Sequence, residues 1–329
     1  ERPNQRGHIA IMTYLTLERA EDMAAWDKFV THSAQGSLYA TATIIEALGC
    51  KADYWYLKRN GYPVLGVPVI VKNAIGTGLP SYSYYVGIMY HPDAWNCKAN
   101  HRTENEMLFC EVLMVKLSEL YDRIELCLHP SISDVRGLDW FNYHTPERGR
   151  VQIHPKYTAQ AMLQPVELIR RNAKSSRRRD EKYAINRENL YFSLDGTVEE
   201  LVSLYDGTLL RQDIKVSKMG LDITEQFART LLVQSLGIIA VVRDKNKQAK
   251  NAGLLMFDHH KLVHLPVVGS SDTRYGGTML YFGMMEHAAK LGFTLIDFNG
   301  ANSPKRGYFK PIKASPFLFS TLILLVHYC

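Results

Sequence analysis

The predicted helices and strands of this chain occur in the same order twice. Each half runs from two helices through antiparallel strands to a long amphipathic helix, and then to a strand that ends in a polar loop. No letter-for-letter repeat accompanies this order. Because 329 residues are too many for one ordinary core, we expect two similar α/β domains that share a cleft. Gln164-Pro165 is the predicted boundary, which gives domains 1–164 and 165–329.

The first half contains one strong turn signal. Asn60-Gly61 stands between two apolar runs, and this dipeptide is typical of a tight β-hairpin. Periodicity and stop signals predict the other elements. The predicted helices are 17–30, 43–48 and 104–121, and the predicted strands are 54–59, 64–71, 124–128 and 157–163.

The second half opens with a short basic helix pair over 166–187. Its predicted strands are 191–194, 238–243, 252–258, 262–268 and 293–298, and its predicted helices are 197–211, 224–235 and 278–291. Gly292 ends the last of these helices. The apolar run 317–326 is too short to span a bilayer, so we expect a terminal core strand there.

Composition indicates a soluble globular protein, with 46% apolar and 22% charged residues. The formal charge of +6 suits anionic partners such as nucleotides, CoA, tRNA or cell-envelope precursors. Five scattered cysteines indicate reduced packing residues in a cytoplasmic protein. We expect tRNA as a possible partner, no DNA and no transmembrane segment, and the oligomeric state stays open.

Several common catalytic motifs are absent from the sequence. It has no G-x-S-x-G, no P-loop, no H-E-x-x-H and no G-x-G-x-x-G after a first strand. His259 and His260 fall in a predicted turn, and the four-residue spacing of His260 and His264 along a strand is too wide for a shared metal. We interpret these histidines as surface turn residues and expect no metal site.

Two stretches near the C-terminus suggest chemistry. The first, from Arg274 to Thr278, opens a helix with Gly276-Gly277, where free N–H groups and the helix dipole favour an anion. The second runs from Asp297 to Lys310. Asp297 ends an apolar strand, where it either serves catalysis, or caps the following turn or pairs with an arginine of the loop. The alternative for both stretches is a capped helix packed on a sheet beside a basic surface loop.

The order of several motifs resembles the Fem-type peptidyl/aminoacyltransferases, FemAB-like members of the GNAT superfamily. The motifs are Asp134-Val-Arg136 with Trp140, then Tyr157-Thr158, the Arg-rich helix, and Asp297-Phe-Asn-Gly300 followed by Gly307-Tyr-Phe-Lys-Pro311. The resemblance covers most of the chain. It implies two tandem GNAT-like domains, each with a mixed, mostly antiparallel sheet flanked by helices.

The resemblance also implies acyl transfer from an activated donor, aminoacyl-tRNA or acyl-CoA, to an amine of a cell-envelope or glycan precursor, without a tightly bound cofactor. The resemblance implies that Lys310 is catalytic. Acyl transfer to an amine also requires removal of a proton, for which Asp297, Tyr308 or Tyr275 is the expected residue. The implied donor-binding residues are Arg274, Tyr275, Gly276, Gly277, Thr278, Asn299, Arg306 and Phe309. The implied acceptor-binding residues are Asp134, Arg136, Trp140, Arg177 and Arg178.

The chain departs from the family in two places. The full Gln/Arg-x-x-Gly-x-Gly/Ala pattern is absent around Arg274, which counts against CoA. The long helical arm of some Fem enzymes is also absent, which counts against tRNA binding through such an arm. Two other functions therefore stay open: an acyl-CoA N-acyltransferase acting on a small amine or amino sugar, and a degenerate, non-catalytic GNAT-like binding module. No activated Ser or Cys is recognisable, so we expect direct transfer.

Overall fold

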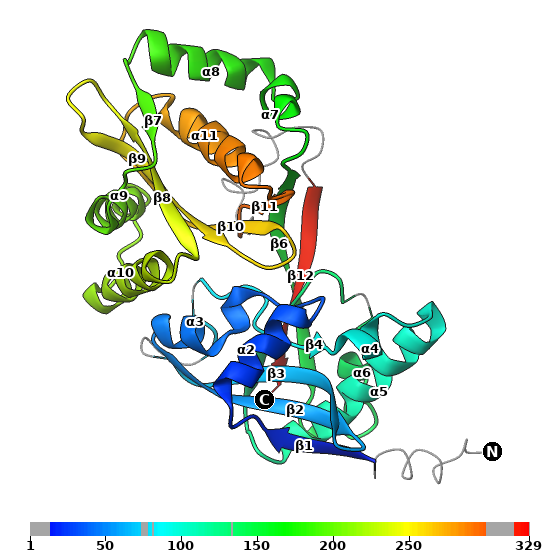
Figure 1. Ribbon diagram of the computed structural model, residues 1–329. Helices are drawn as coiled ribbons and strands as arrows, with labels where there is room; N and C mark the ends of the chain where they lie inside the picture. The colour runs from blue at the N-terminus through cyan, green and yellow to red at the C-terminus, as the bar shows by residue number, and fades with distance from the viewer. Residues whose placement is uncertain (1–13, 74–77, 81, 133, 301–318, 329) are drawn as a thin grey trace. The chain divides into compact units, whose positions relative to one another are not determined.

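The structure is a computed structural model, and it describes residues 14–73, 78–80, 82–132, 134–300 and 319–328, the last range as backbone only (Figure 1). The chain forms two compact units. Unit 1 comprises Glu1–Pro155 and Ile323–Cys329, and unit 2 comprises Lys156–Leu322. These units differ from the predicted domain limits, 1–164 and 165–329, because strands β6 (Val151–Met162) and β12 (Phe319–Tyr328) each contribute residues to both.

Unit 1 contains a four-stranded antiparallel sheet in the order β1-β2-β3-β4. Its strands are β1 (Leu15–Arg19), β2 (Cys50–Arg59), β3 (Tyr62–Asn73) and β4 (Met89–Tyr90), with β5 (Ile124–Leu128) paired to β12. Its helices are α2 (Met23–His32), η1 (Leu38–Ala40), α3 (Ala42–Ala47), α4 (Pro92–Trp95), α5 (Ala99–Ser118), α6 (Arg136–Asp139) and η2 (Pro146–Arg148).

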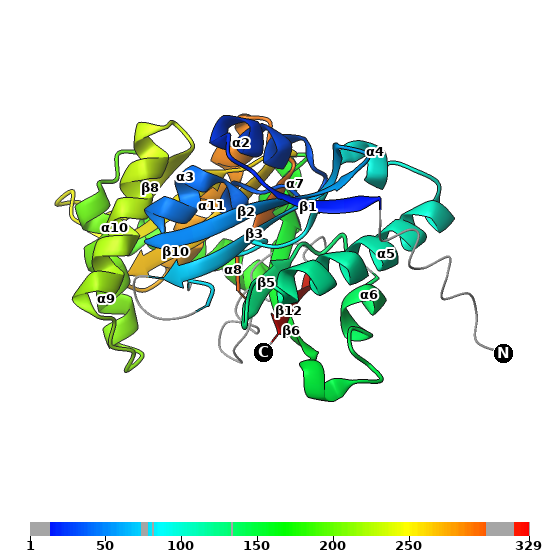
Figure 2. The same ribbon diagram turned by 90° about the horizontal axis from the view of Figure 1, so that it is seen from below.

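The predicted hairpin of unit 1 is confirmed. Asn60 and Gly61 both have positive φ, 51° and 81°, as a two-residue turn between twisted strands requires. Alternation along β2 then sends successive side chains to opposite faces. Leu57 joins the cluster that contains Phe109 of α5, whereas Tyr56 packs against Trp26 of α2. Figure 2 shows β2 and β3 between α2 and α3 on one side and α5 on the other.

The predicted helix over 17–30 is wrong in its first part. Residues Leu15–Arg19 form β1, which pairs antiparallel with β2 from Leu17↔Leu57 to Arg19↔Trp55. The helix begins only at Met23, because the Asp22 side chain accepts hydrogen bonds from the N–H groups of Ala24 and Ala25. The partner strand, more than 30 residues along the chain, therefore decides the conformation of this segment.

Unit 2 contains a sheet in the order β6-β11-β10-β9-β8-β7, in which β10 and β11 are parallel and the other neighbours antiparallel. Besides β6, its strands are β7 (Tyr191–Ser193), β8 (Gly237–Arg243), β9 (Ala249–Phe257), β10 (Leu262–Ser270) and β11 (Leu295–Asp297). Its helices are α7 (Glu167–Arg171), α8 (Ser175–Asn186), α9 (Val198–Leu210), α10 (Lys218–Val233) and α11 (Gly276–Lys290).

Helices cover both faces of this sheet (Figure 1). A side chain on Gly253 of β9 would meet Met284 of α11, whereas one on Gly269 of β10 would meet Leu204 of α9. Gly269 pairs with Ala252, the neighbour of Gly253, and neighbouring residues of a strand face opposite ways. Helix α11 therefore lies on one face with α7 and α8 beside it, and α9 and α10 lie on the other face.

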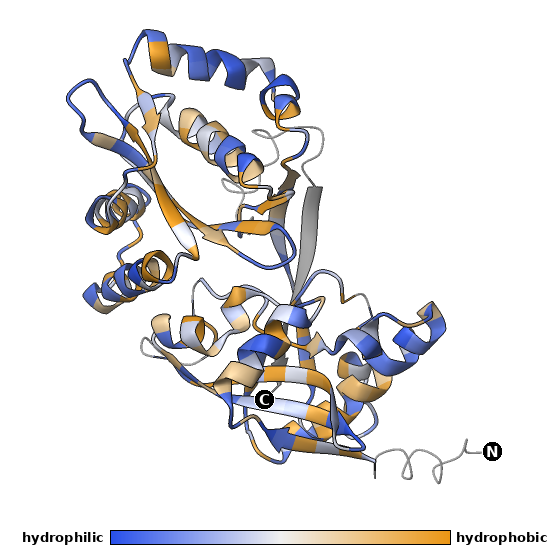
Figure 3. Cartoon of the chain, in the orientation of Figure 1, coloured by the Kyte–Doolittle hydropathy of each residue, from blue (hydrophilic) through white to orange (hydrophobic). Residues whose placement is uncertain are grey.

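The predicted repeat of element order is confirmed, and it extends to the strand that the sequence did not reveal. Unit 1 runs β1, α2, α3, β2, β3, β4, α5, β5, and unit 2 runs β7, α9, α10, β8, β9, β10, α11, β11, apart from short extra helices. Helix pair α7–α8 precedes the second copy. Figure 3 shows α8 as almost entirely hydrophilic, unlike α11 or strands β8 to β10.

The predicted terminal strand is confirmed as β12, which pairs antiparallel with β5. Within the described residues, no helix is both long enough and apolar enough to cross a membrane.

Candidate functional site

Strand β10 leads the chain to the N-terminus of α11. It runs parallel to β11 for only three residue pairs, of which the last is His264↔Asp297. Beyond that pair, β10 continues through an irregularity between His264 and Val267 to Ser270, still paired with β9. A short turn then begins the helix at Gly276. The parallel strands therefore part at His264, and β10 carries the helix N-terminus past the end of β11.

The first turn of α11 has an uncommon cap. The N-cap residue, Tyr275, has a left-handed backbone conformation with φ 66°. For a residue other than glycine this conformation costs about 1 kcal/mol or more of conformational free energy. The Tyr275 ring packs edge-on against Tyr183 of α8, with the centroids 5.4 Å apart.

The N–H groups of the first turn of α11 differ in their partners. The N–H of Gly276 donates to the Arg274 carbonyl at 2.8 Å, and that of Thr278 to the Tyr275 carbonyl at 3.0 Å. Among the described residues the N–H of Gly277 has no acceptor. This N–H and the helix dipole favour an anion.

Glycine is required at position 276 because the Asn251 side chain of β9 lies close to the helix backbone there. A Cβ atom at this position would lie 2.0 Å from Oδ1 of Asn251. Asn251 is 2% exposed, and its Oδ1 has no hydrogen-bond donor within the described part of the chain. A buried carbonyl oxygen without a donor costs free energy. The oxygen therefore lies beside the helix N-terminus ready to accept a hydrogen bond.

These groups line a cavity of about 400 Å³. Its lining residues come from α8, β9, β10, the turn and α11: Arg177, Asp180, Asn251, Ser270, Ser271, Thr273, Arg274, Tyr275, Gly277 and Thr278. The Arg177 guanidinium donates through Nη1 to Asp180 at 2.8 Å, while its buried Nε has no acceptor among the described residues. Arg274 is exposed and has no carboxylate partner there. Two guanidinium groups against one carboxylate make the lining positive.

The structure thus brings together four predicted donor-binding residues at this cavity: Arg274, Tyr275, Gly277 and Thr278. A fifth, Gly276, is the helix residue that Asn251 contacts. The structure adds Arg177, which the sequence placed with the acceptor. Arg178, the other predicted acceptor residue of α8, donates instead to the carbonyls of Arg171 and Ala173. Its observed contacts therefore hold the connection between α7 and α8.

The remaining predicted acceptor residues lie in unit 1 and contact one another. Asp134 accepts hydrogen bonds from the backbone N–H and from Nε of Arg136, both within 3.1 Å. The Arg136 guanidinium lies 5.7 Å from the centre of the Trp140 ring. Trp140 is half exposed. The three side chains form one surface cluster at helix α6.

The Asp134–Arg136 contact predicts a pH effect on stability. Hydrogen bonds from Arg136 hold the pKa of Asp134 below its usual 3.8. A lowered pKa in the folded state means that Asp134 stabilises the protein above that usual value and loses its contribution as the pH falls through the folded-state pKa. Asp134→Asn should therefore lower the melting temperature at pH 7, and the difference from wild type should shrink below about pH 4. An equal difference at pH 7 and pH 3 would contradict this assignment.

The second predicted stretch begins in a buried polar network. Asp297 is fully buried and accepts hydrogen bonds from the Thr158 hydroxyl, from Nε2 of Gln160 at 2.9 Å and from the N–H of Asn299 at 2.8 Å. The contact with the Asn299 N–H therefore shows the alternative role, in which Asp297 caps the following turn. A catalytic role stays a prediction.

His264 extends this network, and its interpretation as a surface turn residue is wrong. It is fully buried, with Nε2 2.8 Å from Oδ2 of Asp258 and Nδ1 3.3 Å from Nδ2 of Asn299. The predicted donor residue Asn299 is thus held in the network rather than in the cavity at α11. A signal was present: His264 and Asp297 are polar residues in otherwise apolar strands, and the register pairs them.

Four predicted site residues, Arg306, Tyr308, Phe309 and Lys310, lie outside the described residues, so their roles stay predictions. The sequence did not reveal Asn251, Asp258 or His264 as site residues. In the described part of the chain, no group of three or more His, Cys, Asp and Glu side chains could hold a metal ion.

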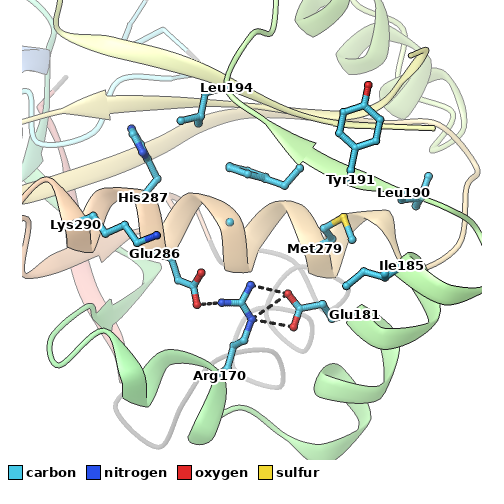
Figure 4. Close-up of a pocket in the computed structure, with 12 residues that line it drawn as sticks. Arg170, Glu181, Ile185, Leu190, Tyr191, Leu194, Met279, Glu286, His287 and Lys290 are labelled. Atoms are coloured by element: carbon cyan, nitrogen blue, oxygen red, sulfur yellow. Dashed lines mark hydrogen bonds and ion pairs between the residues drawn. The ribbon is translucent and has the colours of Figure 1, made fainter. Parts of the chain in front are cut away.

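Unit 2 has a further cavity of about 500 Å³ between α8, β7 and α11 (Figure 4). Arg170 lies at its edge between two carboxylates, with hydrogen bonds of 2.7–3.0 Å to Glu181 and an ion pair with Glu286. Apolar side chains such as Met279 and Leu190 line the rest. Since both carboxylates pair with the same guanidinium, this cluster ties α7, α8 and α11 together.

Neither the protein-family models nor the curated proteins compared with the chain match it. Solved structures do match over nearly the whole length. FemX superposes with a TM-score of 0.61 at 13% identity, covering 93% of this chain and 96% of its own. L-PGS from Bacillus licheniformis gives 0.53 at 12% identity over 93% and 91%.

A tandem GNAT protein from the clavulanic acid biosynthesis pathway gives a TM-score of 0.52 at 11% identity, over 96% of this chain and 98% of that one. Likeness at such identities shows the fold, which alone does not determine function. The predicted architecture, two tandem GNAT-like domains, is confirmed.

Proposed function

We propose that the protein is an N-acyltransferase whose activated donor binds through a phosphate group at the N-terminus of α11. The cavity there carries the proposal. It joins the free N–H of Gly277, the positive end of a 15-residue helix and the guanidinium groups of Arg177 and Arg274. It lies at the far end of β10, beyond the part of that strand that pairs with β11. The fold likeness to FemX and to a tandem GNAT protein supports the reaction class.

We propose aminoacyl-tRNA as the donor, with acyl-CoA as the alternative. The observation in favour of RNA is the charge of the helix pair beside the cavity. Apart from Arg178, which donates to backbone carbonyls, five exposed cations lie on or next to α8 without a carboxylate partner among the described residues: Arg171, Lys174, Arg179, Lys182 and Arg187. A run of charges is often only a solvated surface. Here the same helix also supplies Arg177 to the cavity, so a polyanion bound there could extend along it.

The acceptor in this proposal is an amine of a cell-envelope or glycan precursor. Its nitrogen attacks the acyl carbonyl carbon, an amide bond forms, and the ester bond to tRNA or the thioester bond to CoA breaks. The amine loses a proton and the leaving oxygen or sulfur gains one. Lys310 would stabilise negative charge on the carbonyl oxygen, and Asp297 or Tyr308 would move the proton. Asp134, Arg136 and Trp140 are the proposed acceptor contacts.

Donor binding tests the proposal directly. The melting temperature of the full chain is measured alone, with acetyl-CoA, with charged tRNA and with the same tRNA uncharged. We expect charged tRNA to raise it, because a ligand that binds only the folded state stabilises that state. A rise with acetyl-CoA alone would instead support the acyl-CoA enzyme acting on a small amine. No rise with any of them would contradict the proposed function.

A further inference from the structure

We infer that the cavity at the start of α11 recognises a nucleoside phosphate by two groups at once, the phosphate and a hydroxyl of its sugar. The inference rests on the proposed function, since it concerns the same cavity, and it adds the class of ligand. It follows from the hydrogen-bonding groups that the cavity offers. A site for a bare anion would present donors only, whereas this one also presents a buried acceptor.

The acceptor is the side-chain oxygen of Asn251. The residue is 2% exposed, and its Oδ1 has no donor in the described part of the chain. This oxygen lies against the backbone of Gly276, the first residue of the helix. A carbonyl oxygen cannot bind a phosphate oxygen that carries no proton. It can accept a hydrogen bond from a hydroxyl next to that phosphate.

The phosphate side is supplied by α8 as well as by α11. Asp180 accepts a hydrogen bond of 2.8 Å from Nη1 of Arg177 and so holds the guanidinium in place. The buried Nε of the same group has no acceptor among the described residues. A guanidinium edge that includes Nε suits two parallel hydrogen bonds to phosphate. Gly277, whose N–H has no acceptor among the described residues, lines the same cavity at the helix N-terminus.

The two residues with an unpaired side-chain atom come from different elements, β9 and α8, and both residues line one cavity of about 400 Å³. A ligand that satisfies both must carry an acceptor and a donor within that volume. A ribose phosphate does so, because its phosphate oxygens accept and its hydroxyls donate. Inorganic pyrophosphate carries no sugar hydroxyl to donate to Oδ1 of Asn251.

The test is calorimetric titration of the full chain with three probes: AMP, 2′,3′-dideoxy-AMP and inorganic pyrophosphate. We expect wild type to bind all three and to prefer AMP to its dideoxy form roughly tenfold, since the dideoxy form leaves Oδ1 of Asn251 without a donor. Asn251→Leu should abolish this preference and retain pyrophosphate binding. Arg177→Gln should weaken all three probes, whereas Lys245→Gln, which changes an exposed cation in the turn between β8 and β9 and outside the cavity lining, should not.

Equal affinity of wild type for AMP and 2′,3′-dideoxy-AMP, with pyrophosphate still bound, would overturn the inference and leave the proposed donor site intact. This comparison needs no variant, so a folding defect in Asn251→Leu cannot obscure it. Failure of wild type to bind any of the three probes would instead contradict the donor site itself.

Discussion

Gly276→Ala should lose anion binding at the start of α11 and destabilise the protein. The added methyl group would lie 2.0 Å from Oδ1 of Asn251, a separation that real Cβ atoms do not show. Asn251 is buried, so its side chain, its strand or the helix N-terminus must shift. Overpacking of this kind costs about 1–3 kcal/mol of unfolding free energy. A shift at the first turn also displaces the Gly277 N–H from the cavity.

Gly277→Ala is the matched control for this change. The nearest atom to a Cβ there is Nδ2 of Asn251 at 4.0 Å, so the methyl group fits. Replacing glycine by alanine inside a helix favours folding by up to about 1 kcal/mol. We therefore expect Gly277→Ala to be as stable as wild type or more so, and to bind pyrophosphate as wild type does. Chemical denaturation and calorimetry measure the two effects. Equal behaviour of the two variants would contradict the close contact with Asn251.

Sequence periodicity predicted elements whose signals are local. The hairpin at Asn60-Gly61 and helix α11 with its stop at Gly292 are examples, because turn residues and a repeated apolar face specify them without help from distant segments. Strand β1 was missed for the opposite reason. Its five residues join directly to a helical pattern, and only the pairing with β2 fixes them as a strand.

In the same way, only part of the candidate site could be predicted from local sequence. The Gly276-Gly277 turn could be read from consecutive residues, because a glycine pair at a helix start is a local feature. Asn251 and Arg177 complete the cavity from β9 and α8, and no spacing in the sequence connects them to the turn. Likewise, His264 and Asp258 could be recognised as buried only once β10 was paired with β11.

Asp297 has two possible roles that a pair of substitutions should separate. Asp297→Ala should cost about 3 kcal/mol or more of unfolding free energy, because it leaves the Thr158 hydroxyl, the Gln160 amide and the Asn299 N–H without this acceptor in a fully buried place. Asp297→Asn keeps the size and one oxygen. The Gln160 amide can turn to accept from the new NH₂ group, so we expect a loss of only about 1 kcal/mol.

The near-isosteric variant then tests catalysis without a large change in stability. If Asp297 moves a proton during acyl transfer, Asp297→Asn should lower turnover by about 10²–10⁴-fold, measured with the donor that raises the melting temperature. Retained turnover would show that Asp297 acts only by holding the turn at Asn299. Thr158→Val is the control, because it removes one hydrogen bond to the same carboxylate and changes no charge. Wild-type stability of Asp297→Ala would contradict the anchoring role, since a fully buried acceptor of three hydrogen bonds cannot be removed without cost.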